Sequence, residues 1–297
     1  GRRRPRPTRF EARRMRCRRR GWALALVGFA RAPAVAAQSP EPAGKPLLEL
    51  GVVGGGGYLP DYPAAGQNHL QGLALPYVAY RGEFLRAGDR GLVRGRIFRR
   101  RDFELDVSIS GSFSSDSDDN DARRGMPDLD WLGELGPRLQ YTVLRAARDA
   151  RIDLEFPVRA AFSTDFSSEI VFRGIVFAPE IAYQNMNFLG GGLELKLGLV
   201  PTFATQDLMA YFYEVTPALA TATRPAFRAQ GGYLGTKVEL LLTKQITPRI
   251  RSFFALRTDF YHGATNSGSP LFRDDITVSV GIGLVLSLYQ SKRRARK

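Results

Sequence analysis

Two histidines are the first residues to consider for chemistry, because histidine is the side chain used most often as a general base. His262 is followed by Asn266, Ser267 and Ser269, residue types that can form an orienting group and a nucleophile beside a base. We expect His262 to be a polar loop residue, and a catalytic role is the alternative interpretation. His69 has no Cys or second His nearby, so the sequence does not support a zinc site. We therefore expect no catalytic, cofactor-binding or metal-ligating residue.

A run of acidic residues, Ser114–Asp121, is the second candidate, here for calcium binding. Asp116, Asp118 and Asn120 have the spacing of the first three ligands of an EF-hand loop. Position six of that loop would be Asp121 instead of Gly, and position twelve would be Pro127 instead of Glu. The motif therefore fails. We expect a solvated acidic loop, with loose divalent-cation binding at a membrane surface as the alternative.

The elements that position these residues must be sought outside the charged ends of the chain. The 297 residues carry a formal net charge of +14, which suggests nucleic-acid binding. Residues 1–37 alone hold 12 Arg and one acid, whereas residues 38–291 have a net charge of −2 and residues 292–297 hold five bases. The body of the chain is nearly neutral, and we expect no nucleic-acid partner. A basic nucleic-acid-binding arm is the alternative interpretation of residues 1–37.

The second half of this basic segment is typical of a secretory signal peptide. Met15 is followed by four Arg, then by the apolar run Trp22–Ala30, and then by small residues that end at Ala36 and Ala37. The apolar run has 9 residues, too few for a helix across a bilayer. We therefore expect export, with cleavage near Ala36 or Ala37. The single cysteine, Cys17, precedes the apolar run, so the mature chain would form no disulfide.

After residue 38 the chain repeatedly alternates apolar and polar residues, the two-residue period of a β-strand with two different faces. In Arg151–Phe162 one face begins with Ile152, Leu154 and Phe156, and the other carries Asp153, Glu155 and Arg159. The same period predicts about ten to twelve strands. The expected strands are Leu47–Val53, Leu70–Tyr80, Asp102–Phe113, Leu139–Val143, Arg151–Phe162, Ile170–Tyr183, Leu193–Leu199, Tyr233–Thr243, Ile250–Tyr261 and Ile276–Leu288.

The length of these strands distinguishes two all-β architectures. The clearest ones are about 9 to 13 residues long, which exceeds the usual strand of soluble proteins and suits a tilted crossing of a bilayer. In a soluble sandwich the polar face meets water, whereas in a membrane barrel it lines the lumen and the apolar face meets lipid. Together with the export signal, this predicts an all-β fold: an antiparallel transmembrane β-barrel of about 10–12 strands.

Aromatic residues near the expected strand ends fit the girdles of such a barrel at the two membrane interfaces. Scattered core aromatics are the alternative. The candidates are Tyr77, Tyr80, Tyr211, Phe212, Tyr213, Tyr261 and Tyr289.

Several short motifs, in their order along the chain, resemble the MipA/OmpV family. Gly54–Gly57 followed by Tyr58–Gly66 is similar to the glycine-rich strand and P-D-Y-P-G-like turn of that family, and Leu75–Gly82 is similar to its P-x-x-x-Y-R-G element. Further matches are Leu132–Pro137, Tyr211–Thr216 and Ser269–Leu271, although Glu214 stands where the family usually has Gly. The positions that carry the resemblance are Pro60, Tyr62, Pro63, Gly66, Tyr80, Arg81, Gly82, Gly136, Pro137, Tyr211, Tyr213, Ser269 and Pro270.

The resemblance implies a protein of the outer membrane of a Gram-negative bacterium, surrounded by outer-membrane lipid. The best-known family member is a scaffold that joins a lytic transglycosylase to a peptidoglycan synthase, so the resemblance implies a non-enzymatic scaffold with these partners. We expect an upstream basic segment and signal peptide at 1–37, one barrel domain at 38–291 and a basic tail at 292–297. The alternatives are a narrow outer-membrane pore or solute channel that uses the lumen charges and, less favoured, an outer-membrane hydrolase that uses His262.

Overall fold

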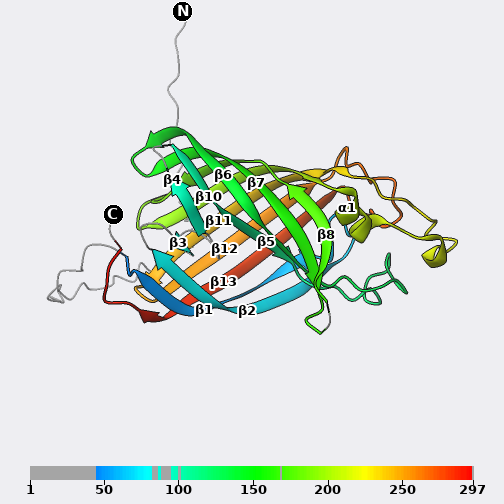
Figure 1. The fold of residues 1–297 in the computed structure, drawn as a ribbon, viewed down its shortest axis with the longest axis horizontal. Helices are drawn as coiled ribbons and strands as arrows, with labels where there is room; N and C mark the ends of the chain where they lie inside the picture. The colour runs from blue at the N-terminus through cyan, green and yellow to red at the C-terminus, as the bar shows by residue number, and fades with distance from the viewer. Residues whose placement is uncertain (1–44, 82–85, 88–94, 100–101, 168, 296–297) are drawn as a thin grey trace, which may run out of the picture. The chain divides into compact units, whose positions relative to one another are not determined.

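The described residues form a single β-sheet with one short α-helix in a loop (Figure 1). The structure, a computed structural model, describes residues 45–81, 86–87, 95–99, 102–167 and 169–295. The predicted signal peptide, its cleavage site and Gly82 lie outside these residues. The strands are β1 (Leu48–Pro60), β2 (Asn68–Arg81), β3 (Arg86–Ala87), β4 (Gly95–Arg99), β5 (Phe103–Ser112), β6 (Trp131–Ala147), β7 (Ala150–Thr164), β8 (Val171–Phe177), β9 (Glu180–Asn185), β10 (Leu193–Ala204), β11 (Gly232–Thr247), β12 (Ile250–Phe260) and β13 (Ile276–Gln290). The helices are α1 (Gln206–Tyr213) and the 3-10 turn η1 (Pro217–Leu219).

Strand pairing runs continuously around the sheet. The 13-stranded order is β11-β12-β13-β1-β2-β3-β4-β5-β6-β7-β8-β10-β9, and β11 also pairs with β10. The first and last strands, β1 and β13, pair antiparallel from Glu49↔Gln290 to Tyr58↔Val280. Both β8 and β9 pair with β7 on one side and β10 on the other, so the thirteen strands occupy twelve positions. The predicted antiparallel β-barrel is confirmed.

The observed strands extend those expected from the sequence, because pairing continues beyond the clearest alternation. The expected Leu139–Val143 becomes the 17-residue β6, and Arg151–Phe162 becomes the 15-residue β7. The expected Ile170–Tyr183 is divided into β8 and β9, which are separated by Ala178 and Pro179. The short strands β3 and β4 were not expected, since their sequence does not alternate clearly.

The two faces of the wall differ as the alternation predicts. On β7 the inward-facing residues Asp153 and Glu155 are 0% and 1% exposed. Phe156 and Val158, which belong to the alternate apolar positions of the same strand, are 39% and 44% exposed. The same contrast runs along β13, where Ile282 and Leu284 are exposed and Ser279 and Ser287 are buried. Burying charges on the inside while exposing large apolar side chains outside is the arrangement of a sheet whose outer surface meets lipid.

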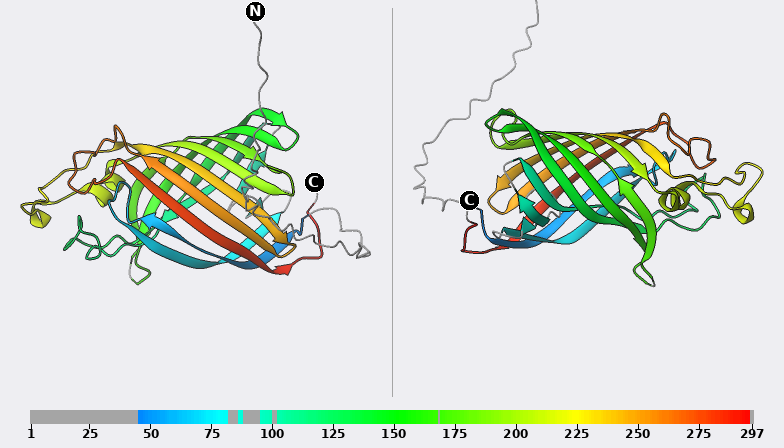
Figure 2. Two further views of the ribbon diagram at one scale, coloured as in Figure 1. Left: turned by 180° about the vertical axis from the view of Figure 1, so that it is seen from behind. Right: turned by 45° about the horizontal axis from the view of Figure 1, so that its top comes forward.

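The two ends of the strands have different connections. One end, here called the loop end, carries the connections 61–67, 113–130, 165–170, 205–231 and 261–275. The opposite end, here called the turn end, carries the connections 148–149, 186–192 and 248–249, together with the start of β1 and the end of β13. Both views in Figure 2 place the C-terminus and the long loops at opposite ends of the strands. In outer-membrane barrels the short turns face the periplasm and the long loops face outward.

The described part of the expected basic tail is paired with the chain that precedes β1. The backbone N–H of Leu47 donates to the carbonyl of Arg293 (2.8 Å), and that of Ala295 donates to the carbonyl of Lys45 (2.9 Å). Residues 293–295 therefore extend the β1–β13 edge at the turn end. Among the described residues, no helix is both long and apolar enough to cross a bilayer.

Several of the expected girdle aromatics lie elsewhere. Tyr80 and Tyr289 are exposed on the outer face near the turn end, as expected. Tyr77 is 3% exposed and points into the lumen, and Phe212, Tyr213 and Tyr261 are buried in the connections at the loop end. The girdle prediction is wrong for these four, because a loop assembly buries aromatic side chains more completely than a membrane interface does.

An arginine on the outer face tests whether that face meets lipid. Val158 lies near the middle of β7 on the exposed apolar face. We expect Val158→Arg to lower the free energy of unfolding from lipid vesicles by about 2–4 kcal/mol, because the bilayer does not solvate the guanidinium. Denaturant titration measures this loss. Leu189→Arg, in the 86% exposed position of a turn-end connection, is the control and should change stability little. Equal effects at both positions would contradict a lipid-facing wall.

Candidate functional site

The family-motif positions gather at the loop end, where three segments far apart in sequence are hydrogen-bonded in a triangle. The Tyr62 hydroxyl donates to the Leu271 carbonyl (2.7 Å), and the Tyr213 hydroxyl donates to the Pro63 carbonyl (2.9 Å). The Ser269 hydroxyl closes the triangle by donating to the Tyr213 carbonyl (2.7 Å). We call the connections 61–67, 113–130, 205–231 and 261–275 together the cap.

An apolar core fills the cap and continues into the barrel. Its buried members in the connections are Tyr62, Ala65, Leu129, Leu208, Met209, Phe212, Tyr213, Val215, Ala229 and Leu271. They belong to the same cluster as Leu132, Ala161, Val176, Val200, Ala204 and Leu234, which lie in or next to the loop-end parts of the strands. A core of this size makes the cap a packed structure that covers this end of the lumen.

Helix α1 supplies much of this core, and sequence analysis missed it. Leu208, Met209, Phe212 and Tyr213 are its buried residues, at the i, i+1, i+4, i+5 spacing of one helical face. This spacing was the available signal, but the stretch is only 8 residues long. The helix starts at Thr205, whose hydroxyl accepts from the backbone N–H of Ile175 (2.9 Å) and so fixes α1 to β8.

The connection 113–130, which contains the acidic run Ser114–Asp121, contacts the rest of the cap through neutral and basic side chains. Asn120 is 1% exposed and its side-chain amide donates to the Asp61 carboxylate (2.7 Å). Arg123, also buried, lies with its guanidinium 5.6 Å from the centre of the Tyr62 ring and donates to the Phe212 carbonyl (3.3 Å). Asn120, counted as a possible calcium ligand, is therefore engaged within the cap. Among the described residues, no group of three or more His, Cys, Asp or Glu is placed to hold a metal ion.

The residues around His262 are engaged in the same assembly. The imidazole of His262 is exposed. The Asn266 side chain is buried, donating to the Gln230 carbonyl (2.8 Å) and accepting from the Gln230 N–H (2.9 Å). Ser269 uses its hydroxyl on Tyr213, as described above. These side chains therefore hold two loops together. The Nδ1 of His69, at the start of β2, lies within hydrogen-bonding distance of the Asp61 carboxylate (2.6 Å).

The remaining motif positions lie in the wall or at the opposite end. Gly136 and Pro137 are in the middle of β6, where a Cβ on Gly136 would overlap the carbonyl of Val158 on the neighbouring strand. At the turn end, the buried Arg81 donates to Glu49 (2.9 Å) and to the Pro46 carbonyl (2.9 Å). The motif positions therefore form one cluster in the cap, with separate contributions to wall packing and to the turn end. Pro60, Gly66, Tyr211 and Pro270 also belong to the cap or its border.

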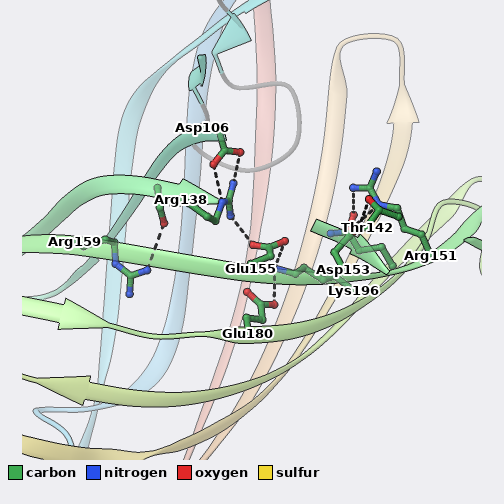
Figure 3. Close-up of polar contacts among 11 residues, drawn as sticks. Asp106, Arg138, Thr142, Arg151, Asp153, Glu155, Arg159, Glu180 and Lys196 are labelled. Carbon is green, nitrogen blue, oxygen red and sulfur yellow. Dashed lines mark hydrogen bonds and ion pairs between the residues drawn. The ribbon is translucent and has the colours of Figure 1, made fainter. Parts of the chain in front are cut away.

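A network of ion pairs runs along the inner wall of the lumen, from β5 to β10 (Figure 3). Arg138 of β6 contacts both carboxylate oxygens of Asp106 on β5 (2.8 and 2.7 Å) and reaches Glu155 on β7 (2.8 Å). Lys196 of β10 contacts Glu180 on β9 (2.7 Å) and Glu155 (3.8 Å). Since a buried charge without a partner is costly, this network of ion pairs fixes five consecutive strands relative to one another.

Two further ion pairs flank this network in the lumen (Figure 3). Arg159 contacts Glu134 (2.7 Å), and Arg151 contacts Asp153 (2.8 Å). The Asp153 carboxylate also accepts from the Thr142 hydroxyl (2.7 Å). The predicted lumen charges Asp153, Glu155 and Arg159 therefore do face inward, where they are neutralised by partners.

Ser269→Ala tests whether the cap is a cooperative structure. The substitution leaves the Tyr213 carbonyl and the Leu271 N–H, which donates to the Ser269 hydroxyl (3.2 Å), without these partners. We expect a local loss of about 1–3 kcal/mol, measured as faster amide exchange at Leu271 and faster proteolysis of residues 205–231. The exposed Ser267→Ala is the matched control and should leave both rates unchanged. If both variants behave alike, the hydrogen-bonded triangle does not hold the cap.

The cap should loosen at high pH. Burial raises the pKa of Tyr62 to about 12 and raises the pKa of Tyr213 well above its ordinary value. A folded-state pKa above the unfolded value of 10.0 means that the stabilisation is complete below pH 10 and decreases as the pH rises toward 12. Amide exchange at Leu271 across this range should accelerate more steeply than exchange at an unstructured amide, whose base-catalysed rate also rises with pH. Because Tyr62→Phe removes one titrating hydroxyl, it should flatten the dependence; an unchanged slope would contradict the assignment.

Comparisons with solved structures gave weak likenesses, among them three outer-membrane proteins. A NanC porin has a TM-score of 0.38 and 13% identity, covering 80% of this chain and 100% of that chain. A protein described as a bacterial polysaccharide outer membrane secretin has a TM-score of 0.39 and 9% identity, covering 82% and 99%. The outer membrane phospholipase A of Escherichia coli has a TM-score of 0.33 and 11% identity, covering 82% and 93%. A comparison with curated proteins gave no match.

The sequence itself gives a more specific relationship. A family model described as "MltA-interacting protein MipA" matches residues 52–287, from the first strand to the last. This range includes the cap, the ion pairs of the lumen and almost every position in the motifs described above. The chain therefore belongs to the MipA family.

Proposed function

We propose that this chain is a non-enzymatic outer-membrane β-barrel that acts as an anchored scaffold for peptidoglycan-cleaving and peptidoglycan-synthesising enzymes. The observation that carries the proposal is the covered loop end of the lumen. The cap is closed by the hydrogen bonds of Tyr62, Tyr213 and Ser269 and filled by an apolar core. Such a barrel is better suited to anchoring than to conducting solutes, because paired charged side chains on its inner wall also occupy the lumen.

The turn end offers the surface for a partner. It faces the periplasm in the usual orientation of outer-membrane barrels. Arg148, Arg249, Lys292 and Arg293 are exposed there, on connections and on the edge that extends β13. Basic side chains clustered at one end favour a partner with an acidic surface. The description of the family, MltA-interacting protein, supports a lytic transglycosylase as that partner.

Charge reversal at the turn end tests this surface. We expect replacement of Arg148, Arg249 and Arg293 by Glu to weaken binding of purified MltA roughly tenfold, measured with the folded barrel immobilised in detergent micelles. The matched control replaces Arg228 and Arg273, exposed bases of the cap, and should bind as the unmodified protein does. Heat-modifiable gel mobility checks that each variant is folded.

Measurements on the same preparation distinguish the scaffold function from the alternative function as a pore. Loss of binding in the cap variant and not in the turn-end variant would contradict the proposed surface. A steady conductance in planar bilayers, together with no MltA binding by the unmodified protein, would contradict the scaffold and support the solute channel. The expected result is binding without a steady conductance.

A further inference from the structure

The turn-end half of the lumen contains a cavity of about 380 Å³ that the scaffold role does not use. Its lining residues come from eight strands and from the 186–192 connection, most of them at positions closer to the turn end than to the cap. They are Tyr77, Arg138, Glu155, Gln184, Met186, Glu194, Leu195, Lys196, Leu241, Thr243, Arg251, Phe253, Ala255 and Val285. Small-molecule sites are typically cavities of this kind, with a mostly apolar lining and a few polar groups.

Arg251 differs in its contacts from Arg138 and Lys196, the other two cations that line the cavity. Arg138 and Lys196 on the opposite wall are held by carboxylates, as Figure 3 shows. Arg251 donates to the Tyr77 hydroxyl (3.2 Å), and its Nε is buried with no hydrogen-bond partner among the described residues. Within the described part of the chain, no ion pair joins its guanidinium to a carboxylate. A buried guanidinium donor that lacks an acceptor is unusual, because it loses hydration without compensation.

An apolar surface lies directly beside this unpaired donor. The Phe253 ring, on the next inward position of β12, covers Gly55 of β1 and Gly283 of β13, and a Cβ at either glycine would crowd it. Leu241 and Val285 complete this side of the cavity. A solute with an acceptor at one end and an apolar body would therefore satisfy the guanidinium and cover the Phe253 ring.

The charge of the cavity restricts that acceptor. A carboxylate accepts two parallel hydrogen bonds from a guanidinium, which neutral acceptors do not match. Glu194 also lines the cavity, on β10, and disfavours a second negative group on the same solute. The cavity is therefore matched to a solute with a single carboxylate.

From these contacts we propose that the turn-end half of the lumen is a binding site for a small organic monocarboxylate, held by Arg251 and Tyr77 with its apolar body against Phe253. The site is independent of any protein partner. Because the cap covers the loop end, the solute enters and leaves from the turn end.

Two fluorinated probes test the proposal on the intact folded barrel in detergent micelles. We expect 4-fluorobenzoate to bind saturably, as followed by ¹⁹F NMR, and 4-fluorobenzamide, of nearly equal shape but uncharged, to bind at least roughly tenfold more weakly. This comparison needs no variant, so it does not depend on the folding of a substituted chain. Terephthalate, with a second carboxylate, should compete poorly.

Variants then locate the site. Arg251→Gln should weaken 4-fluorobenzoate binding roughly tenfold, Arg251→Lys should weaken it less, and Tyr77→Phe should cause a smaller loss. Arg249→Gln removes the same charge from the adjacent exposed turn and should leave binding unchanged. No saturable binding, equal binding of acid and amide, or full binding by folded Arg251→Gln would overturn the proposal. If the unmodified protein binds the probe and does not bind MltA, the result would contradict the scaffold function alone.

Discussion

The fold depends on satisfying every backbone hydrogen bond inside the membrane. The bilayer core contains no water to pair with exposed N–H and C=O groups, so a strand that crosses it must be paired on both sides. Pairing of β1 with β13 and of β10 with β11 meets this condition where the chain's ends and its longest connection would otherwise leave edges. Once the wall is continuous, the two-residue period assigns each side chain to lipid or to the lumen.

The lumen and the cap both contain buried polar groups, and the two regions satisfy these groups with different interactions. Inward-facing charges such as Asp106 and Arg138 are held in pairs because the lumen cannot hydrate them fully. At the loop end, the connections bury apolar side chains and bond their polar groups to one another. Arg251 is the exception in the turn-end cavity: among the described residues its guanidinium has a hydroxyl partner and no carboxylate, which is why we propose a ligand there.

The sequence predicted the structure wherever the alternation of residues within one segment determines which face a side chain occupies. Arg151–Phe162 predicted both the strand β7 and the inward position of Asp153 and Glu155, because alternation alone determines the face. The cap could not be predicted in this way. Its contacts join residues 56 to 209 positions apart, such as Tyr62 with Leu271, and the motifs gave their order without their proximity. Helix α1 was missed because 8 residues give too little helical period to outweigh a loop.

Cell fractionation combined with heat-modifiable gel mobility tests the central claim most directly, since a closed membrane-spanning barrel underlies every functional statement. We expect the mature chain to be recovered with the outer membrane, and its unheated form to migrate differently from the boiled form because the barrel resists detergent unfolding. Recovery in the soluble fraction, with the same mobility before and after boiling, would contradict a transmembrane barrel.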